Sequence, residues 1–442
     1  MSEGVDTVGL DTPPKLAVDG LLDDPQTRII VCCGAGGVGK TTTAAALGVR
    51  AAERGRKAVV LTIDPARRLA QSMGIDSLDN TPRKVATVGT GAAAGGGELH
   101  AMMLDMKRTF DEIVEAHADA ERARAILANP FYQSLSAGFA GTQEYMAMEK
   151  LGQLRARDDW DLIIVDTPPS RSALDFLDAP KRLGSFLDGK FIRVLMAPAK
   201  VGGRAGMKFL NVGMSMMTGT LSKLMGASLL KDVQTFVAAM DTMFGGFRTR
   251  ADATFRLLQA PGTAFLVVAA PEPDALREAA YFVERLAAER MPLAGLVLNR
   301  VHTSGAGQLS AERALAAAEN LEEGGIVDQE AGKAGLRDAA GDSPDRASGP
   351  ASDPSSAPSS DQYPDHDPGD SPDVDEITAG LLRLHAERMQ VIAREQRTRD
   401  RFTSLHPEVA VAEVAALPGD VHDLAGLRAI GERLAAGVPA GA

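Results

Sequence analysis

Apolar residues fall into short runs along the chain, and these runs predict the strands of a mostly parallel sheet. The first run, Thr27 to Cys33, is β-branched and precedes a glycine cluster, as is typical of a buried strand. A helical pattern from Val38 to Arg54 ends at Gly55, and a second apolar run covers Lys57 to Ile63. Strand, helix and strand at this spacing form a βαβ unit, which predicts a parallel sheet.

The same alternation continues downstream. Further strands are predicted at Glu98–Met103, Asp161–Val165, Ala264–Ala269, Leu293–Leu298 and Val409–Val414. Helices are predicted at Thr142–Arg157, Pro273–Arg290 and Asp423–Ala435. We find no strand pattern between about 170 and 258, and we expect a helical insertion there. The predicted fold class is therefore α/β, with a mostly parallel sheet flanked by helices and a helical insertion.

One segment differs in composition from the rest. Between Glu322 and Glu376 the chain is dense in Asp, Ser, Pro and Gly, and we predict a disordered acidic loop. An amphipathic pattern then covers Ile377 to Phe402, so this loop interrupts a domain that resumes after it. The predicted parts are a flexible arm at 1–26, a body at 27–321, the loop at 322–376 and a completing helix–strand–helix at 377–442.

The net charge belongs to this loop. The 442 residues include 47 Lys and Arg and 59 Asp and Glu, which gives a formal charge of −12. The segment 322–376 contains fifteen acidic and three basic residues, so the remainder of the chain is balanced. The loop is therefore expected to be a solvated, self-repelling tether, and we expect no nucleic-acid partner.

Cysteine usage and the N-terminal sequence indicate a cytoplasmic protein. The two cysteines, Cys32 and Cys33, are adjacent, so by themselves they form neither a disulfide framework nor a thiolate metal site. The first residues lack the basic start and apolar core of a signal peptide. No apolar run approaches the roughly 20 residues of a membrane helix.

A glycine-rich motif follows the first predicted strand. Gly34 to Thr41 reads GAGGVGKT and fits G-x-x-x-x-G-K-[ST] between a strand and a helix. Glycines let backbone N–H groups wrap a phosphate, and the helix N-terminus adds a favourable potential. Lys40 is expected to reach the β- and γ-phosphates, and the Thr41 hydroxyl to ligate Mg²⁺. The predicted ATP-binding residues here are Gly34, Ala35, Gly36, Gly37, Val38, Gly39, Lys40, Thr41 and Thr42.

Two acids end predicted strands and are candidates for the chemistry. Asp166 follows the apolar run Leu162–Val165 and is expected to hold Mg²⁺ directly or through water; the alternative is a helix N-cap. Asp64 follows the second strand and is expected to orient or deprotonate the attacking water; the alternative is a simple turn residue. Together with Lys40, Asp64 forms the predicted catalytic pair.

The glycine-rich motif, Asp64-Pro65-Ala66, and Asp166-Thr167-Pro168-Pro169 with Leu174–Leu177 resemble the anion-transporting ATPase family. This family includes the arsenite-pump ATPase and the ATPase that targets tail-anchored proteins. The resemblance covers about 27–300 and 377–436. It implies a P-loop NTPase fold, ATP and Mg²⁺ as cofactors, nucleotide held between two subunits, and an adenine contact by Asn299.

Departures from the family pattern restrict the function. The resemblance places a second, dimer-crossing lysine where this chain has Ala35. Either another cation substitutes for it, or the partner is a related ATPase chain that keeps its lysine (a heterodimer), or hydrolysis in a homodimer is slow. Arg171-Ser172 replaces Gly-His after the second acid, and Arg171 is either a phosphate contact or a surface residue. Few cysteines and no C-x-x-C pair mean that neither arsenite capture nor a zinc clamp is expected.

Methionines gather in the predicted helical insertion, including Met207, Met214, Met216 and Met217. They line either a groove for apolar clients or a subdomain core or dimer contact. We therefore expect an ATPase whose hydrolysis of ATP drives a conformational switch serving a hydrophobic client or membrane partner. The alternative is a nucleotide-switched partition or scaffold protein with incidental turnover, and arsenite efflux ranks last.

Overall fold

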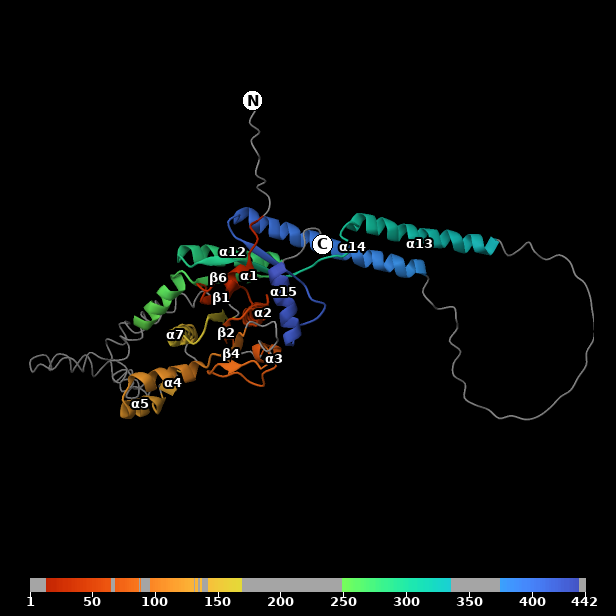
Figure 1. The fold of residues 1–442 in the computed structure, drawn as a ribbon. Coiled ribbons are helices and arrows are strands. Elements are labelled where there is room, and N and C mark those ends of the chain that lie inside the picture. Colours follow the sequence, from red (N-terminus) through yellow and green to blue (C-terminus); the bar gives the residue numbers. More distant parts are fainter. Residues whose placement is uncertain are drawn as a thin grey trace, which may run out of the picture. The chain divides into compact units, whose positions relative to one another are not determined.

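The computed structural model describes residues 13–64, 68–86, 88, 96–130, 132–133, 136, 142–168, 249–334 and 374–436. It has the predicted α/β class, a mostly parallel sheet with helices (Figure 1). The described residues form two compact units. We call the first the sheet unit, which holds the residues up to Val301 and from Glu395 onward, and the second the hairpin unit, His302–Arg394.

The sheet unit is built on eight strands in the order β3-β4-β2-β5-β1-β6-β7-β8. Neighbours pair in parallel except β3, which runs antiparallel to β4. The strands are β1 (Ile29–Cys33), β2 (Lys57–Thr62), β3 (Arg83–Lys84), β4 (Glu98–Met103), β5 (Leu162–Asp166), β6 (Thr263–Ala269), β7 (Leu293–Val301) and β8 (Val411–Ala415). All seven strands predicted from apolar runs are present, and within the described ranges the short β3 is the one additional strand.

Both faces of the sheet are buried, which explains why its central strands are apolar throughout. Ile29 and Val31 of β1 lie in the core cluster on one face, and Ile30 and Cys32 in the cluster on the other. Helices α4, α5, α7 and α12 contribute to the first cluster, and α1, α2, α3 and α15 to the second. Their bounds are α1 (Val18–Asp23), α2 (Lys40–Glu53), α3 (Arg68–Ser72), α4 (Met106–His117), α5 (Ala120–Leu127), α7 (Thr142–Arg157), α12 (Pro273–Ala288) and α15 (Leu424–Ala436).

The expected flexible arm at 1–26 is wrong for its described part. Residues from Pro13 onward pack on the sheet unit, and Leu16, Val18 and Leu22 are buried. The backbone of this segment pairs with β8, because Leu16 N–H donates to the carbonyl of Val411 at 3.0 Å. The Gly, Pro and Asp content of the segment suggested a flexible arm, but burial of its three apolar residues stabilises the packed conformation.

The hairpin unit contains α13 (Ala311–Ala334) and the first part of α14 (Val374–Leu405). The disorder expected from Glu322 is wrong for the beginning of that segment, because α13 continues to Ala334, and α14 already begins at Val374. The intervening part of the predicted loop lies outside the described residues. Most of the predicted insertion also lies outside them, and its described end, 249–258, is helical.

Candidate functional site

At two glycines of the loop between β1 and α2, a side chain would overlap a neighbouring strand. Gly34 has φ +145°, and a Cβ there would overlap the carbonyl of Val268 on the neighbouring β6. Gly39 has φ +95°, and a Cβ there would overlap the side-chain amide of Asn299 on β7. The loop therefore packs closely against β6 and β7. At these two glycines its backbone adopts φ angles that residues with a side chain rarely adopt. Gly36, Gly37 and Val38 lie within the same loop, and Thr42 lies in the first turn of α2.

Lys40 opens α2 and is buried. Its Nζ donates to the carbonyl of Ala35 at 2.7 Å, so the ammonium group lies inside the curve of the loop. Burial lowers the pKa of Lys40, and the nearby Asp166 carboxylate is the largest influence that opposes this shift. A desolvated cation held among backbone groups is suited to an anion such as a phosphate.

Asp166 ends β5 and is completely buried. One carboxylate oxygen, Oδ2, accepts hydrogen bonds from the hydroxyls of Thr41 at 2.7 Å and Thr62 at 2.8 Å. The other, Oδ1, has no partner among the described residues. Burial raises the pKa of Asp166 to about 6, although both hydroxyl hydrogen bonds act to lower it. A buried carboxylate with an unsatisfied oxygen beside a threonine hydroxyl is a donor set that fits Mg²⁺.

Asp64 follows β2 and lies near this pair. Its backbone N–H donates to the hydroxyl of Thr62 at 3.2 Å. Its charge acts on both Lys40, whose pKa it raises, and Asp166, whose pKa it also raises. The structure thus brings the second acid into electrostatic range of the lysine and of the first acid.

Asn299 lies on β7 and is buried against the loop. Its Nδ2 donates to the carbonyl of Val38 at 2.8 Å. The side chain therefore supports the loop backbone, and its contact with adenine stays a prediction. Cys32 and Cys33 are buried on β1, and desolvation raises the pKa of both thiols, that of Cys33 to about 12. Arg171 and the methionine-rich insertion lie outside the described residues.

Two side chains at the site were not found from the sequence. Thr62 lies opposite Asp166 in the register of β2 and β5, which is how its hydroxyl reaches the carboxylate. Gln143 near the start of α7 donates through Nε2 to the carbonyl of Ile63 at 2.9 Å. Thr62 ends a predicted strand, but the strand order of the sheet is what brings it beside Asp166. Nothing in the local sequence indicated Gln143.

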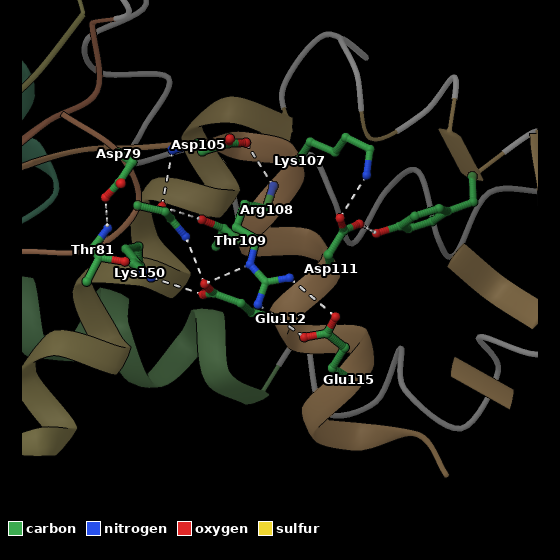
Figure 2. Close-up of polar contacts among 12 residues, drawn as sticks. Asp79, Thr81, Asp105, Lys107, Arg108, Thr109, Asp111, Glu112, Glu115 and Lys150 are labelled. Carbon is green, nitrogen blue, oxygen red and sulfur yellow. Dashed lines mark hydrogen bonds and ion pairs between the residues drawn. The ribbon is translucent and has the colours of Figure 1, made fainter. Parts of the chain in front are cut away.

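A second polar cluster lies away from the loop, between α4 and α7 (Figure 2). Lys150 of α7 is 5% exposed, and its Nζ contacts Glu112 of α4 at 3.0 Å. Buried Asn80 donates to the same carboxylate at 3.3 Å and accepts from the hydroxyl of Thr109 at 3.1 Å. This cluster joins α7, which leads into β5, to α4 and to the segment before β4.

These features define a class of protein. A mostly parallel sheet, a glycine-rich loop between β1 and α2 and a buried acid at the end of the neighbouring β5 are those of a P-loop NTPase. The chain belongs to the anion-transporting ATPase family, whose model matches residues 27–316. Members of this family are nucleotide-binding ATPases.

Relatives of this chain carry related names. It is 30% identical over 177 residues to "ATPase GET3" of Malassezia globosa, which covers 40% of this chain and 49% of that protein. It is 29% identical over 205 residues to the "Putative arsenical pump-driving ATPase" of Halobacterium salinarum, covering 45% of this chain and 31% of that protein. A match to "ATPase GET3" of Podospora anserina is longer, with 25% identity over 294 residues, 66% of this chain and 78% of that protein. The chain thus spans half or less of the first two relatives. Among the described helices, none is long and apolar enough to cross a membrane.

Proposed function

We propose that this chain is a Mg²⁺-dependent ATPase that hydrolyses ATP to ADP and phosphate. The observation that carries the proposal is the Thr41–Asp166 pair, with one unsatisfied carboxylate oxygen beside the buried ammonium of Lys40. A hydroxyl, a carboxylate and a lysine at the mouth of a glycine loop are what a metal-bound triphosphate requires.

Each residue has a role in this proposal. Thr41 and Asp166 would hold Mg²⁺, which neutralises charge on the phosphates when bound. Backbone N–H groups of the loop and the start of α2 would bind the phosphates. Lys40 would exchange its bond to the Ala35 carbonyl for phosphate oxygens. Asp64 would orient the attacking water and accept its proton as the bond from the γ-phosphate to ADP breaks.

The output that we propose is a conformational switch for a hydrophobic client or a membrane partner. It would operate in a homodimer or in a heterodimer with a related chain. The family membership and the ATPase names of the relatives support this reading. Arsenite pumping, named for the Halobacterium relative, is disfavoured here because Cys32 and Cys33 are buried thiols with raised pKa values.

A second candidate is a nucleotide-switched scaffold with incidental turnover. It is favoured by Ala35, which has no cationic side chain to offer to a second nucleotide site. The Asp64→Asn variant separates the two. A partner interaction that depends on ATP and survives in this variant supports the scaffold, whereas turnover that a client stimulates and the variant loses supports the ATPase switch.

Lys40→Ala tests the proposed site. Removing the ammonium group is expected to abolish ATP turnover, because it takes away the cation that contacts the loop at the carbonyl of Ala35. The measurement is phosphate release by the purified chain with ATP and Mg²⁺. Lys84→Ala, at an exposed ion pair with Glu98, is the matched control and should hydrolyse ATP at the parent rate. Parent-level turnover by Lys40→Ala would overturn the site assignment.

A further inference from the structure

The peptide group that joins Ile63 to Asp64 is held on two sides by side chains. Gln143 donates from Nε2 to the carbonyl of Ile63 at 2.9 Å, and the N–H of Asp64 donates to the Thr62 hydroxyl at 3.2 Å. The C=O and N–H of a peptide group lie in one rigid plane and, in the trans form, point in opposite directions. The two hydrogen bonds therefore fix this plane, which limits the directions in which the Asp64 side chain leaves the backbone.

Ile63 is also fixed at its other groups. Its N–H donates to the carbonyl of Asp166 at 3.0 Å, which ties the end of β2 to the end of β5. Its side chain is buried in the core cluster that includes Met146 of α7. The residue before Asp64 is thus held through its N–H, its carbonyl and its side chain, and Gln143 supplies the contact at the carbonyl.

The helix that carries Gln143 is itself anchored. Lys150 of α7 contacts Glu112 of α4 at 3.0 Å (Figure 2). Glu149 of α7 contacts Arg250 at 2.8 Å, and the Glu149 side chain is only 4% exposed. A polar group on a helix that is fixed by packing and ion pairs is placed more precisely than one on a loop. Gln143 is therefore suited to hold a neighbouring backbone group in one place.

We propose that Gln143 is a positioning residue, through which α7 holds Asp64 where it can orient the water that attacks ATP. The inference rests on the proposed ATPase function and deepens it, because it assigns a role to a residue outside the glycine-rich loop and outside the two strands that precede the acids. In this role Gln143 acts through the peptide group between residues 63 and 64 and needs no contact with the nucleotide.

The chemistry of the side chain suits this role. A glutamine amide donates a hydrogen bond without adding a charge beside Asp64. Methionine at position 143 would keep nearly the same length and remove the donor. Glutamate there would keep the shape but, when ionised, could only accept hydrogen bonds, so its oxygens would repel the Ile63 carbonyl. Gln143→Met and Gln143→Glu thus remove the same bond in two different ways.

Steady-state kinetics of the full chain with ATP and Mg²⁺ is the first measurement. Gln143→Met is expected to lower kcat about tenfold or more and to leave KM for ATP within about twofold, because displacement of a catalytic group slows the chemical step without removing a contact to bound ATP. Gln143→Glu should lower kcat at least as much. Parent-level kcat in both variants, in a chain that hydrolyses ATP, would overturn the inference.

Gln259→Met is the matched control. Gln259 is half-buried like Gln143, and its Nε2 donates to a backbone carbonyl, that of Glu289 at the end of α12, at 2.7 Å. This control loses the same kind of bond at a place where no acid of the candidate site follows, so it should keep the parent kcat. Thermal unfolding verifies that the variants fold. An equal loss of kcat in Gln143→Met and Gln259→Met would reduce Gln143 to a structural role.

Hydrogen exchange at the Asp64 amide, measured without ATP by mass spectrometry of overlapping peptides, reports on the same peptide group independently of turnover. Gln143→Met is expected to accelerate this exchange about tenfold or more, because the peptide group is then held on one side only. Gln259→Met should leave it at the parent rate.

The exchange measurement separates the two proposals. An unchanged exchange rate in Gln143→Met would overturn the positioning role, whatever the kinetics. Faster exchange in Gln143→Met, together with a parent chain that does not hydrolyse ATP, would keep Gln143 as the residue that positions Asp64 and would overturn the ATPase proposal instead.

Discussion

Thr62 is the side chain that joins the two acids of the candidate site. Its hydroxyl donates to Asp166 Oδ2 at 2.8 Å and accepts from the backbone N–H of Asp64 at 3.2 Å. The hydroxyl stabilises the ionised form of Asp166 and so holds its pKa lower than burial alone would. In the proposed site, Thr62 would therefore affect both the affinity for Mg²⁺ and the position of Asp64.

Thr62→Val is expected to raise the pKa of Asp166 further above its present value of about 6. Mg²⁺ requires the carboxylate form, so its apparent affinity falls as the pH drops through the pKa of that group. Loss of one hydrogen bond to the carboxylate corresponds to about one to two pKa units, so the variant should lose this affinity at a higher pH than the parent and bind Mg²⁺ about two- to tenfold more weakly at neutral pH. Titration of Mg²⁺ in the ATPase assay at several pH values is the measurement. Thr62→Ser, which keeps the hydroxyl, should behave as the parent, and an unshifted Thr62→Val profile would contradict the role.

Gly39→Ala tests the fit of the loop against β7. A methyl group there would overlap the Asn299 amide, and φ +95° is unfavourable for alanine. We expect the variant to unfold at least about 1–2 kcal/mol more easily and to lose binding of ATP, as measured by urea unfolding and by a fluorescent ATP analogue. Gly305→Ala is the control, because a Cβ there meets nothing within 4 Å, and it should change neither quantity.

The glycine-rich motif and the acid-ended strand predicted individual residues of the candidate site, but not all of the side chains that contact them. The pattern from Gly34 to Thr41 and the acid at the end of an apolar run led to Lys40 and Asp166, which the structure brings together. Thr62 and the support of the loop by Asn299 depend on which strands become neighbours. That is set by the topology of the sheet, not by local spacing.

Helices α4 and α7 are joined by an ion pair between buried Lys150 and Glu112, whose side chain is 29% exposed (Figure 2). Glu112→Ala would leave the Lys150 ammonium buried without its charged partner. We expect a loss of about 2–3 kcal/mol in the free energy of unfolding, measured by urea denaturation. Most of it should be recovered in Glu112→Leu combined with Lys150→Met, because no unpaired charge remains.

Lys107→Ala is the matched control for this pair. Lys107 contacts Asp111 on the same α4 at 2.7 Å, but its side chain is 51% exposed. Ion pairs of this exposure contribute little, so the variant should stay within about 0.5 kcal/mol of the parent. Equal losses in Glu112→Ala and Lys107→Ala would show that the burial of Lys150 has no particular effect.

Elements were predicted well where apolar residues cluster and poorly where they do not. Strand β4 has the predicted bounds, and β1 and β5 differ by one or two residues, because their apolar runs have turn residues on both sides. Strand β3 is two exposed residues, Arg83 and Lys84, with no pattern to detect. Helix α13 continues to Ala334 through acidic sequence that contains three glycines, so local helix propensity did not indicate this continuation.

The two ends of the described chain close the same side of the sheet unit. Lys15 pairs with Val411 of β8, and the Lys15 ammonium donates to the carbonyl of Ala436 at 2.7 Å. Leu22, between these contacts and β1, is completely buried. The N-terminal segment is therefore part of the folded unit, contrary to what its composition predicted.

Leu22→Ala measures how much this closure contributes. Truncating a fully buried leucine is expected to lower the free energy of unfolding by about 2–5 kcal/mol, as determined by thermal or urea unfolding. Leu405→Ala, at an exposed position of α14, is the control and should have little effect. A Leu22→Ala variant as stable as the parent would mean that the segment is as loose as its sequence composition suggests.

The last strand of the sheet unit is also synthesised long after the strand with which it pairs. Strand β8 pairs with β7, but 110 positions separate Val301 from Val411, and α15, which contacts α2, follows β8. A ribosome that adds roughly 5–20 residues per second needs about 5–20 s to cross that interval. During this time the nascent chain presents β7 as an open edge, the kind of surface to which other strands adhere. Biosynthesis of this protein thus includes a period in which the sheet is nearly complete but still lacks its last strand.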